Sequence, residues 1–263
     1  MTETGRILIR GGGDLASGVA AVLFRNGWQV LIAELSEPKV VRRKVAFAEA
    51  VWEGWQQVEE IIAVLAKEDV EIENVLQAGR IAVIVDPQAE VVNRFNFAAI
   101  VDARMLKHFS PDAISAQIPL IGLGPGFVVG KNCLAVVETN RGENLGEIIW
   151  EGSAEQDTGV PAVVEGRGLE RVLYSPREGI VRSFVQIGDF VKQGEVVAEV
   201  DGTTVVAPFD GLVRGLLRDG LKVGAQVKLG DIDPRMEPSL ATRISDKALV
   251  IGKSVLDIVE NLQ

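Results

Sequence analysis

Runs of Val, Ile and Leu alternate with amphipathic stretches along the first half of the chain. Continuous apolar runs predict buried strands, whereas apolar residues that recur every three or four positions predict helices. Strands are expected at 6–10, 28–35, 81–85, 97–101, 118–123 and 134–137. Because such runs separated by helices are typical of a parallel sheet covered on both faces, we predict an α/β, Rossmann-like domain.

The helices are predicted from the same spacing. One begins at Asp14 and ends at Gly27, with apolar side chains on one face. Others are expected from Pro38 through Trp55, over 58–66, and over 255–262 at the end of the chain.

The character of the sequence changes near Gly152, where Gly, Glu and Arg become frequent. We therefore predict two domains, a Rossmann-like nucleotide-binding domain over 1–155 and a small all-β domain over 156–263 that carries the C-terminal helix. The second domain contains an internal repeat, because the pattern at 176–182 recurs at 208–214. Two equivalent β units of this size predict a small barrel or sandwich with pseudo-symmetry.

This repeat resembles the biotinyl/lipoyl-like barrel-sandwich hybrid. Such carriers bear a modified lysine on the hairpin between the repeats. The corresponding stretch here, 200–205, has no lysine. The resemblance therefore implies the fold without biotin or lipoate chemistry.

Composition and charge narrow the function. Twenty-seven Lys and Arg stand against 37 Asp and Glu, a formal charge of −10, which argues against nucleic-acid and anionic membrane partners. Because the chain has one Cys and one His, an internal disulfide and a Cys/His zinc cluster are excluded, and no metal site is predicted. No signal peptide or membrane span is read, so a cytoplasmic protein is expected.

The first glycine-rich loop is the strongest local signal. Gly11, Gly12 and Gly13 follow a predicted strand and precede a helix, in the order G-x-G-x-x-A. Glycines there bring the backbone close to a pyrophosphate at a helix N-terminus. Glu34, at the end of the next strand, is a candidate ribose ligand, which favours NAD-like over NADP-like ligands. Asp14 has two interpretations, a site residue beside the phosphates or a plain helix cap.

A second set of candidates follows other predicted strands. Because ligands bind outside the carboxyl ends of parallel strands, we expect these residues to face the same crevice as the first loop, although strand termination and capping explain them equally well. They are Asp86, Asp102, Arg104, Gly122, Gly124 and Gly126. Neither glycine loop has the residues of an ATP-binding P-loop.

Three other features have a functional and a structural interpretation. Cys133 is either a buried apolar residue or a carrier of sulfur or selenium. Arg141 lies in a polar turn that either holds an anionic ligand or is solvated. The segment 230–235 either binds a hard metal or forms a turn with internal Asp–Arg pairing, and we favour the turn.

In combination, seven motifs resemble the accessory-protein family of selenium-dependent molybdenum hydroxylases (the YqeB-type family). Its Rossmann-type half is similar to that of the xanthine dehydrogenase accessory proteins. The motifs lie at 10–16, 101–105, 121–127, 137–142, 150–154, 230–235 and 244–247. One position departs from the family pattern, because Glu143 stands where a His often follows the Arg-Gly pair.

The resemblance implies a maturation or insertion protein for a molybdenum hydroxylase client. Its ligand would be an NAD-like dinucleotide or the dinucleotide form of the molybdenum cofactor. Two alternatives stay open: an NAD-dependent oxidoreductase of unknown small substrate, and a non-catalytic scaffold. The sequence does not decide whether a reaction is catalysed, nor the oligomeric state, a homo-oligomer included.

Overall fold

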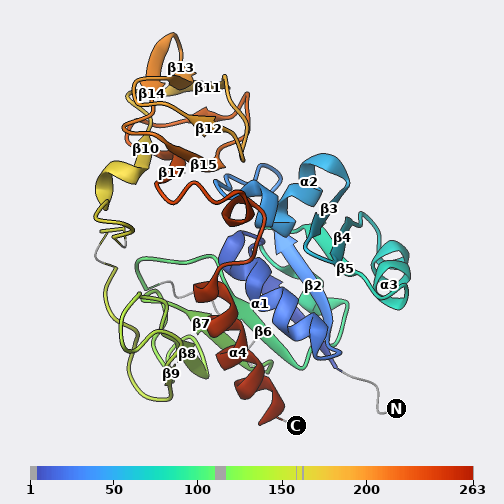
Figure 1. Cartoon of the computed structure of the whole chain (residues 1–263). Helices are drawn as coiled ribbons and strands as arrows, with labels where there is room; N and C mark the ends of the chain where they lie inside the picture. The colour runs from blue at the N-terminus through green and yellow to red at the C-terminus, as the bar shows by residue number, and fades with distance from the viewer. Residues whose placement is uncertain (1–4, 110–116, 158, 162, 263) are drawn as a thin grey trace. The chain divides into compact units, whose positions relative to one another are not determined.

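The computed structural model describes residues 5–109, 117–157, 159–161 and 163–262. The chain divides into two compact units, each described by itself below (Figure 1). The first unit comprises Met1–Pro38, Ala46–Thr158 and Ile244–Gln263. The second comprises Lys39–Val45 and Gly159–Arg243.

The first unit is built on a nine-stranded sheet with the order β3-β4-β5-β2-β1-β6-β7-β8-β9. All neighbours from β4 to β8 are parallel, and the edge strands β3 and β9 are antiparallel to theirs. This is the large, mostly parallel sheet of a mixed α/β fold. The strands are β1 (Arg6–Arg10), β2 (Gln29–Glu34), β3 (Trp55–Val58), β4 (Ile61–Leu65), β5 (Ile81–Val85), β6 (Ala99–Asp102), β7 (Leu120–Leu123), β8 (Ala135–Val137) and β9 (Ile148–Ile149).

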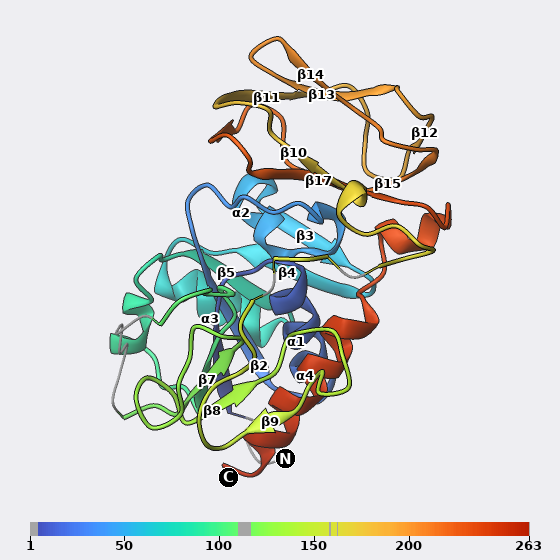
Figure 2. The ribbon, with the colours of Figure 1, turned by 90° about the vertical axis from the view of Figure 1, so that its left-hand side faces the viewer.

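Two helices lie side by side on the sheet, as Figures 1 and 2 show: α1 (Asp14–Arg25) and α4 (Asp246–Glu260). Glycines allow their close approach. A Cβ on Gly18 would lie 2.4 Å from Ala248 Cβ, and one on Gly252 would lie 2.8 Å from Val22 Cγ2. The final helix therefore belongs to the first unit, although the sequence placed it in the second domain.

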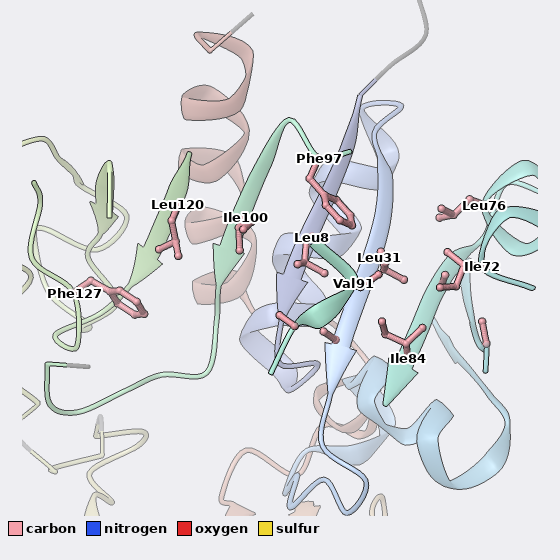
Figure 3. Packing of buried hydrophobic residues seen from close by; sticks show 14 of the residues in the cluster. Leu8, Leu31, Ile72, Leu76, Ile84, Val91, Phe97, Ile100, Leu120 and Phe127 are labelled. Carbon is pink, nitrogen blue, oxygen red and sulfur yellow. The ribbon is translucent and has the colours of Figure 1, made fainter. Parts of the chain in front are cut away.

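A cluster of buried apolar side chains covers one face of the sheet (Figure 3). Leu8, Leu31 and Ile100 from three neighbouring strands are buried there with Ile72 and Leu76 of α3 (Asp69–Gln77). The three consecutive apolar residues at the centre of β1 are all fully buried. A strand with no exposed face has a continuous run of apolar residues, which is why the sequence located every parallel strand except β4.

The second unit contains two four-stranded antiparallel sheets, β10-β17-β15-β12 and β14-β13-β11-β16. Their inner faces share one apolar core. The strands are β10 (Val172–Tyr174), β11 (Gly179–Ser183), β12 (Phe190–Val191), β13 (Val196–Val200), β14 (Thr203–Val206), β15 (Gly211–Leu216), β16 (Lys222–Val223) and β17 (Lys228–Asp233).

The sequence repeat has a direct structural counterpart. The first strand of each repeat, β11 or β15, pairs with a strand of its own repeat, β13 or β17. It also pairs across to the other repeat, since β11 bonds β16 and β15 bonds β12. Each repeat therefore contributes a strand to the sheet of the other.

Several helix predictions were wrong. The stretch 58–66, expected as a helix, contains the end of β3, a turn with Glu59 at φ 54°, and β4. Short apolar runs fit a strand as well as a helix turn, and only tertiary pairing decides. The helix expected after Pro38 is reduced to two 3₁₀ turns, η1 (Arg43–Val45) and η2 (Phe47–Glu49), and the short α2 (Ala50–Glu53).

The final helix is longer than expected, because it begins at Asp246 after a Ser245 cap that accepts a hydrogen bond from the Ala248 amide. Helix α3 was not expected at all. No helix within the described ranges is long and apolar enough to cross a bilayer.

Candidate functional site

The carboxyl ends of the parallel strands bring the sequence candidates to one edge of the sheet. The strand order changes direction between β1 and β6, because β2 and β5 lie on one side and β7 and β8 on the other. Open α/β sheets bind ligands outside the carboxyl ends of their strands at such a switch point. The first glycine loop follows β1, and Asp102 ends β6, so both flank this position.

The three glycines of the first loop have different roles. Gly11 has φ 87°, and a Cβ there would lie 3.4 Å from the carbonyl oxygen of Ala103. A Cβ on Gly12 would lie 2.9 Å from the backbone nitrogen of Ala48, a distance real Cβ atoms do not reach. Among the described residues, and apart from its chain neighbours, a Cβ on Gly13 would have no atom within 4 Å. Gly12 is therefore required by packing and Gly11 by its left-handed backbone conformation, whereas Gly13 borders open space.

A segment of chain that the sequence analysis did not connect with the loop holds it in place. The Ala48 N–H donates to the Gly12 carbonyl at 2.9 Å. The buried Ser17 hydroxyl donates to the same carbonyl at 3.1 Å and accepts from the Phe47 N–H at 2.8 Å. These bonds hold the loop in one conformation without a ligand. Binding to such a loop costs less conformational entropy than binding to a flexible one.

Glu34 braces the loop from the other side. Its Oε1 accepts from the Gly12 N–H at 2.8 Å and its Oε2 from the Leu35 N–H at 2.5 Å. Burial raises the pKa of Glu34 above its ordinary value, and the two amide donors counteract part of that shift. The structure thus gives Glu34 a loop-supporting role, and both oxygens already hold a backbone donor at the position where a ribose was expected.

Asp102 lies between two guanidinium groups. Arg10 Nη1 donates to Asp102 Oδ2 at 3.0 Å, and both residues are buried. Arg104 Nε and Nη2 donate to the two oxygens of Asp102 at 2.9 and 2.8 Å. Together the three side chains carry one net positive charge. Arg104 lies beside the first loop, since its Cα would be 3.6 Å from a Cβ on Gly11.

The other candidates have structural duties. Asp86 accepts from the Glu90 and Val91 amides at 3.0 and 2.8 Å and so caps a 3₁₀ turn. A Cβ on Gly122 would lie 2.1 Å from Phe127, and one on Gly126 2.4 Å from Leu106. Gly124 has φ 82° and packs on Thr139. The second glycine loop is therefore shaped by internal packing.

Lys247 was missed as a site residue in the sequence analysis. It lies in the first turn of α4, and its charge interacts with Asp14, the first residue of α1. Burial lowers the pKa of Lys247, as does the nearby Arg141, while Asp14 and Glu138 act in the opposite direction. In the sequence, Lys247 stood out only as part of the motif at 244–247, which supports the family resemblance and assigns the residue no role. A cation beside the first glycine loop becomes visible only once α4 is packed on α1.

The loop after β8 has its own anchors. Glu138 is buried and accepts from the Asn140 and Glu155 amides at 2.6 and 2.7 Å. Arg141, a candidate anion ligand, pairs with Asp246 through two hydrogen bonds of 3.1 and 2.9 Å. The polar turn is thereby tied to the first turn of α4.

Cys133 is half-buried, and burial raises the pKa of its thiol to about 11. Such a thiol stays protonated near neutral pH, which is the state of a structural rather than a nucleophilic cysteine. Across the part of the chain that the structure describes, no three His, Cys, Asp or Glu side chains gather to hold a metal ion. The edge therefore combines two glycine loops with arginine side chains that are paired with carboxylates.

Comparison with known proteins adds one relative. The chain is 44% identical over 251 residues to the uncharacterized protein YqeB of Escherichia coli K12, a match that covers 95% of this chain and 46% of that protein. The chain therefore spans about half the length of this relative. No protein-family model matches the chain.

Solved structures are only remotely similar. An aspartoacylase family protein of Mesorhizobium loti is 11% identical, with 88% of this chain and 85% of the other covered at a TM-score of 0.28. The ectoine utilization protein EutE of Ruegeria pomeroyi is 10% identical, with 88% and 87% covered at a TM-score of 0.27. Similarities this weak carry no argument about activity.

Proposed function

We propose that the first unit is a Rossmann-like domain that binds a nucleotide-bearing ligand at the carboxyl edge between β1 and β6. The strands β5-β2-β1-β6-β7-β8 follow the order of a doubly wound dinucleotide-binding sheet, with β3 and β4 added at one edge and β9 at the other. In such a sheet the diphosphate lies against the loop after the first strand, at the N-terminus of the first helix.

The observation that carries the proposal is the open space at Gly13. Gly13 is the N-cap of α1 and provides no side-chain cap, so the first turn of a 12-residue helix presents its amides beside a vacant backbone surface. Glycine there serves no internal contact, unlike its two neighbours. A phosphate at this point would accept from the helix amides and gain from the helix dipole.

The surrounding charges suit a phosphate. The Arg10–Asp102–Arg104 group carries one net positive charge, and Arg104 is its partly exposed member. Lys247 offsets the carboxylate of Asp14, which would otherwise repel the ligand at the start of α1. The hydrogen bonds from Arg104 to Asp102 hold its guanidinium in place at the edge.

We further propose that the chain is an accessory protein in the maturation of a selenium-dependent molybdenum hydroxylase. The support is the set of motifs in the first unit together with the scarcity of His and Cys, of which the chain has one each. The ligand would be an NAD-like dinucleotide or the dinucleotide form of the molybdenum cofactor. The second unit, proposed as barrel-sandwich-like, carries no lysine in the β13–β14 turn at Asp201 and Gly202 and would dock the client protein.

A maturation assay tests this proposal. The client hydroxylase is produced in cells that lack this protein and are supplied with the wild type, Gly13→Asp, or Gly224→Asp as the matched control. Gly224 lies in the second unit, and a Cβ there would meet only Val227 at an ordinary 3.8 Å. We expect activity and cofactor content of the client with the wild type and the control, and loss of both with Gly13→Asp. Full client activity without any of the three would refute the accessory role.

A further inference from the structure

A second cluster of buried charges lies wholly within the second unit, in the segment 230–235 and its neighbours. Asp231 and Asp233 are two residues apart on β17 and so share a face of the sheet, while Ile232 between them joins the apolar core. Both carboxylates are almost completely buried, with exposed fractions of 3% and 0%. Buried charges of this kind need partners, since an unpaired one costs several kcal/mol.

Three arginines surround these carboxylates. Arg235 donates from Nε and Nη2 to Asp233 at 2.9 and 2.6 Å, which confirms the Asp–Arg pairing expected of this segment. Arg214 is the extra residue of a bulge in β15, because Val213 pairs with Ile232 and Gly215 with Asp231. Bulges re-aim side chains, and here Arg214 Nη1 lies 3.4 Å from Asp231 Oδ2.

The third arginine, Arg171, has no such bond. It ends the 3₁₀ turn η4 (Leu169–Arg171) immediately before β10 and is 6% exposed. Its Nη1 stands 3.7 Å from Asp231 Oδ1 and 4.0 Å from Asp233 Oδ2, beyond hydrogen-bond distance. Among the described residues, neither its Nε nor its Nη1 has a hydrogen-bond partner.

The cluster therefore has more donors than acceptors. Among the described residues, two nitrogens of Arg171 and the Nε of Arg214 lack a hydrogen-bond acceptor, although Arg214 Nε lies 3.8 Å from Asp233 Oδ2. Asp231 Oδ1 is the acceptor of the cluster that lacks a donor. Three guanidiniums and two carboxylates leave one net positive charge. Glu165 and Glu237 act on Arg235, at the more exposed side of the cluster. The charge of Arg171 likewise interacts with the neighbouring, exposed Glu170, whose pKa it helps to lower.

We propose that this cluster is an oxyanion site that takes a phosphate group, held by Arg171 with Arg214. A phosphate supplies several acceptor oxygens for the buried N–H groups that lack an acceptor. Of the two arginines that would hold the anion, Arg214 is the partly exposed one, with its side chain 15% exposed. The phosphate is either inorganic or the terminal group of a nucleotide.

Phosphate binding to the full-length chain tests the site, by isothermal titration calorimetry with inorganic phosphate and with AMP against sodium chloride of equal ionic strength. We expect saturable binding of inorganic phosphate by the wild type. With Arg171→Gln, which removes a charge-assisted hydrogen bond, the Kd should rise at least ~10-fold, while Arg171→Lys should weaken it less. Arg182→Gln, at an exposed arginine of the same unit, is the control and should leave it unchanged.

Arg104→Gln separates this inference from the proposed nucleotide site. It should leave the phosphate Kd intact, and equal loss with Arg104→Gln and with the control would overturn the assignment to Arg171. If AMP binds as tightly as phosphate and is equally sensitive to Arg171→Gln, the phosphate is a nucleotide's terminal group. Absence of saturable binding by the wild type would refute the site regardless of how the variants fold.

Discussion

Arg10 and Asp102 form a buried ion pair between adjacent parallel strands, with Arg10 Nη1 3.0 Å from Asp102 Oδ2. Both side chains are at most 4% exposed. The pair lies directly below the point where the glycine loop leaves β1 and Arg104 leaves β6. The pair therefore joins β1 and β6 at the switch point. Asp102 also accepts from Arg104 and so holds that side chain at the carboxyl edge of the sheet.

Replacement of Asp102 by Asn should destabilise the protein strongly. The substitution removes the carboxylate charge that pairs with the buried Arg10 guanidinium, and breaking a buried ion pair typically costs about 3–5 kcal/mol. The free energy of unfolding from urea titration measures the loss. As a control, Glu178→Gln breaks an exposed pair with Lys222 and should hardly move the urea midpoint. Equal midpoints for Asp102→Asn and the wild type would contradict the role of the pair.

Replacement of Gly18 by Ala tests the packing of α4 on α1. Alanine in a helix is intrinsically favoured by ~1 kcal/mol over glycine. Here the new methyl would lie 2.4 Å from Ala248 Cβ and 3.0 Å from its carbonyl carbon, so the helices must separate. We expect a net loss of about 1–3 kcal/mol by urea denaturation. Gly224→Ala, which meets no close neighbour, should be nearly neutral, and a stabilised Gly18→Ala would show that the helices are not in contact.

Lys247 should make stability depend on alkaline pH. Its pKa is lowered in the folded state, chiefly by burial, so the unfolded chain binds the proton more tightly. The wild type should therefore be less stable than Lys247→Met at neutral pH. That deficit should shrink as the pH rises through the folded-state pKa toward the ordinary lysine value. Urea titrations of both proteins across this range measure the difference.

Lys253, exposed on the same helix, provides the matched control for that experiment. The difference in the free energy of unfolding between Lys253→Met and the wild type should not shrink in this way as the pH rises. If the difference in the free energy of unfolding between Lys247→Met and the wild type stayed constant across the whole pH range, the lowered pKa of Lys247 would be contradicted.

Cys133 should react slowly with thiol reagents. With its pKa raised to about 11, only a small fraction is thiolate at mildly alkaline pH. We expect alkylation by iodoacetamide to be far slower in the native protein than in urea, as followed by mass spectrometry. Rapid native alkylation would instead favour a reactive cysteine and reopen a sulfur- or selenium-carrying role. Cys133→Ser should support client maturation as well as the wild type.

Strands such as β1 and β5 could be predicted from the sequence because they are buried on both faces, so that their consecutive residues are apolar. The glycine loop was readable because a strand, three glycines and a helix follow one another locally. The repeat likewise predicted two matched strand sets. These features depend on neighbours along the chain.

Long-range packing was not readable. The sequence of the β3–β4 hairpin fits a helix as well as a strand, and its pairing with β5 decides the outcome. The first half of α4 was not predicted because it contains Gly252, a poor helix former that is needed there for the close contact with Gly18. Lys247 acquires its position beside Asp14 only through that contact. Gly12 and Gly13 look identical in the sequence, but Ala48 packs against one of them and leaves the other open.

The central claim is that Gly13 borders a nucleotide-phosphate site, and a thermal-shift panel tests it most directly. The wild type and Gly13→Asp are melted with NAD⁺, NADH, NADP⁺, ATP, CTP and a cytidine dinucleotide analogue. A ligand that binds only the folded state at 100-fold excess over Kd adds ~2.7 kcal/mol, which is readily seen. We predict that a dinucleotide raises the Tm of the wild type but not of Gly13→Asp. An unchanged Tm with every nucleotide, or equal shifts in both proteins, would contradict the account.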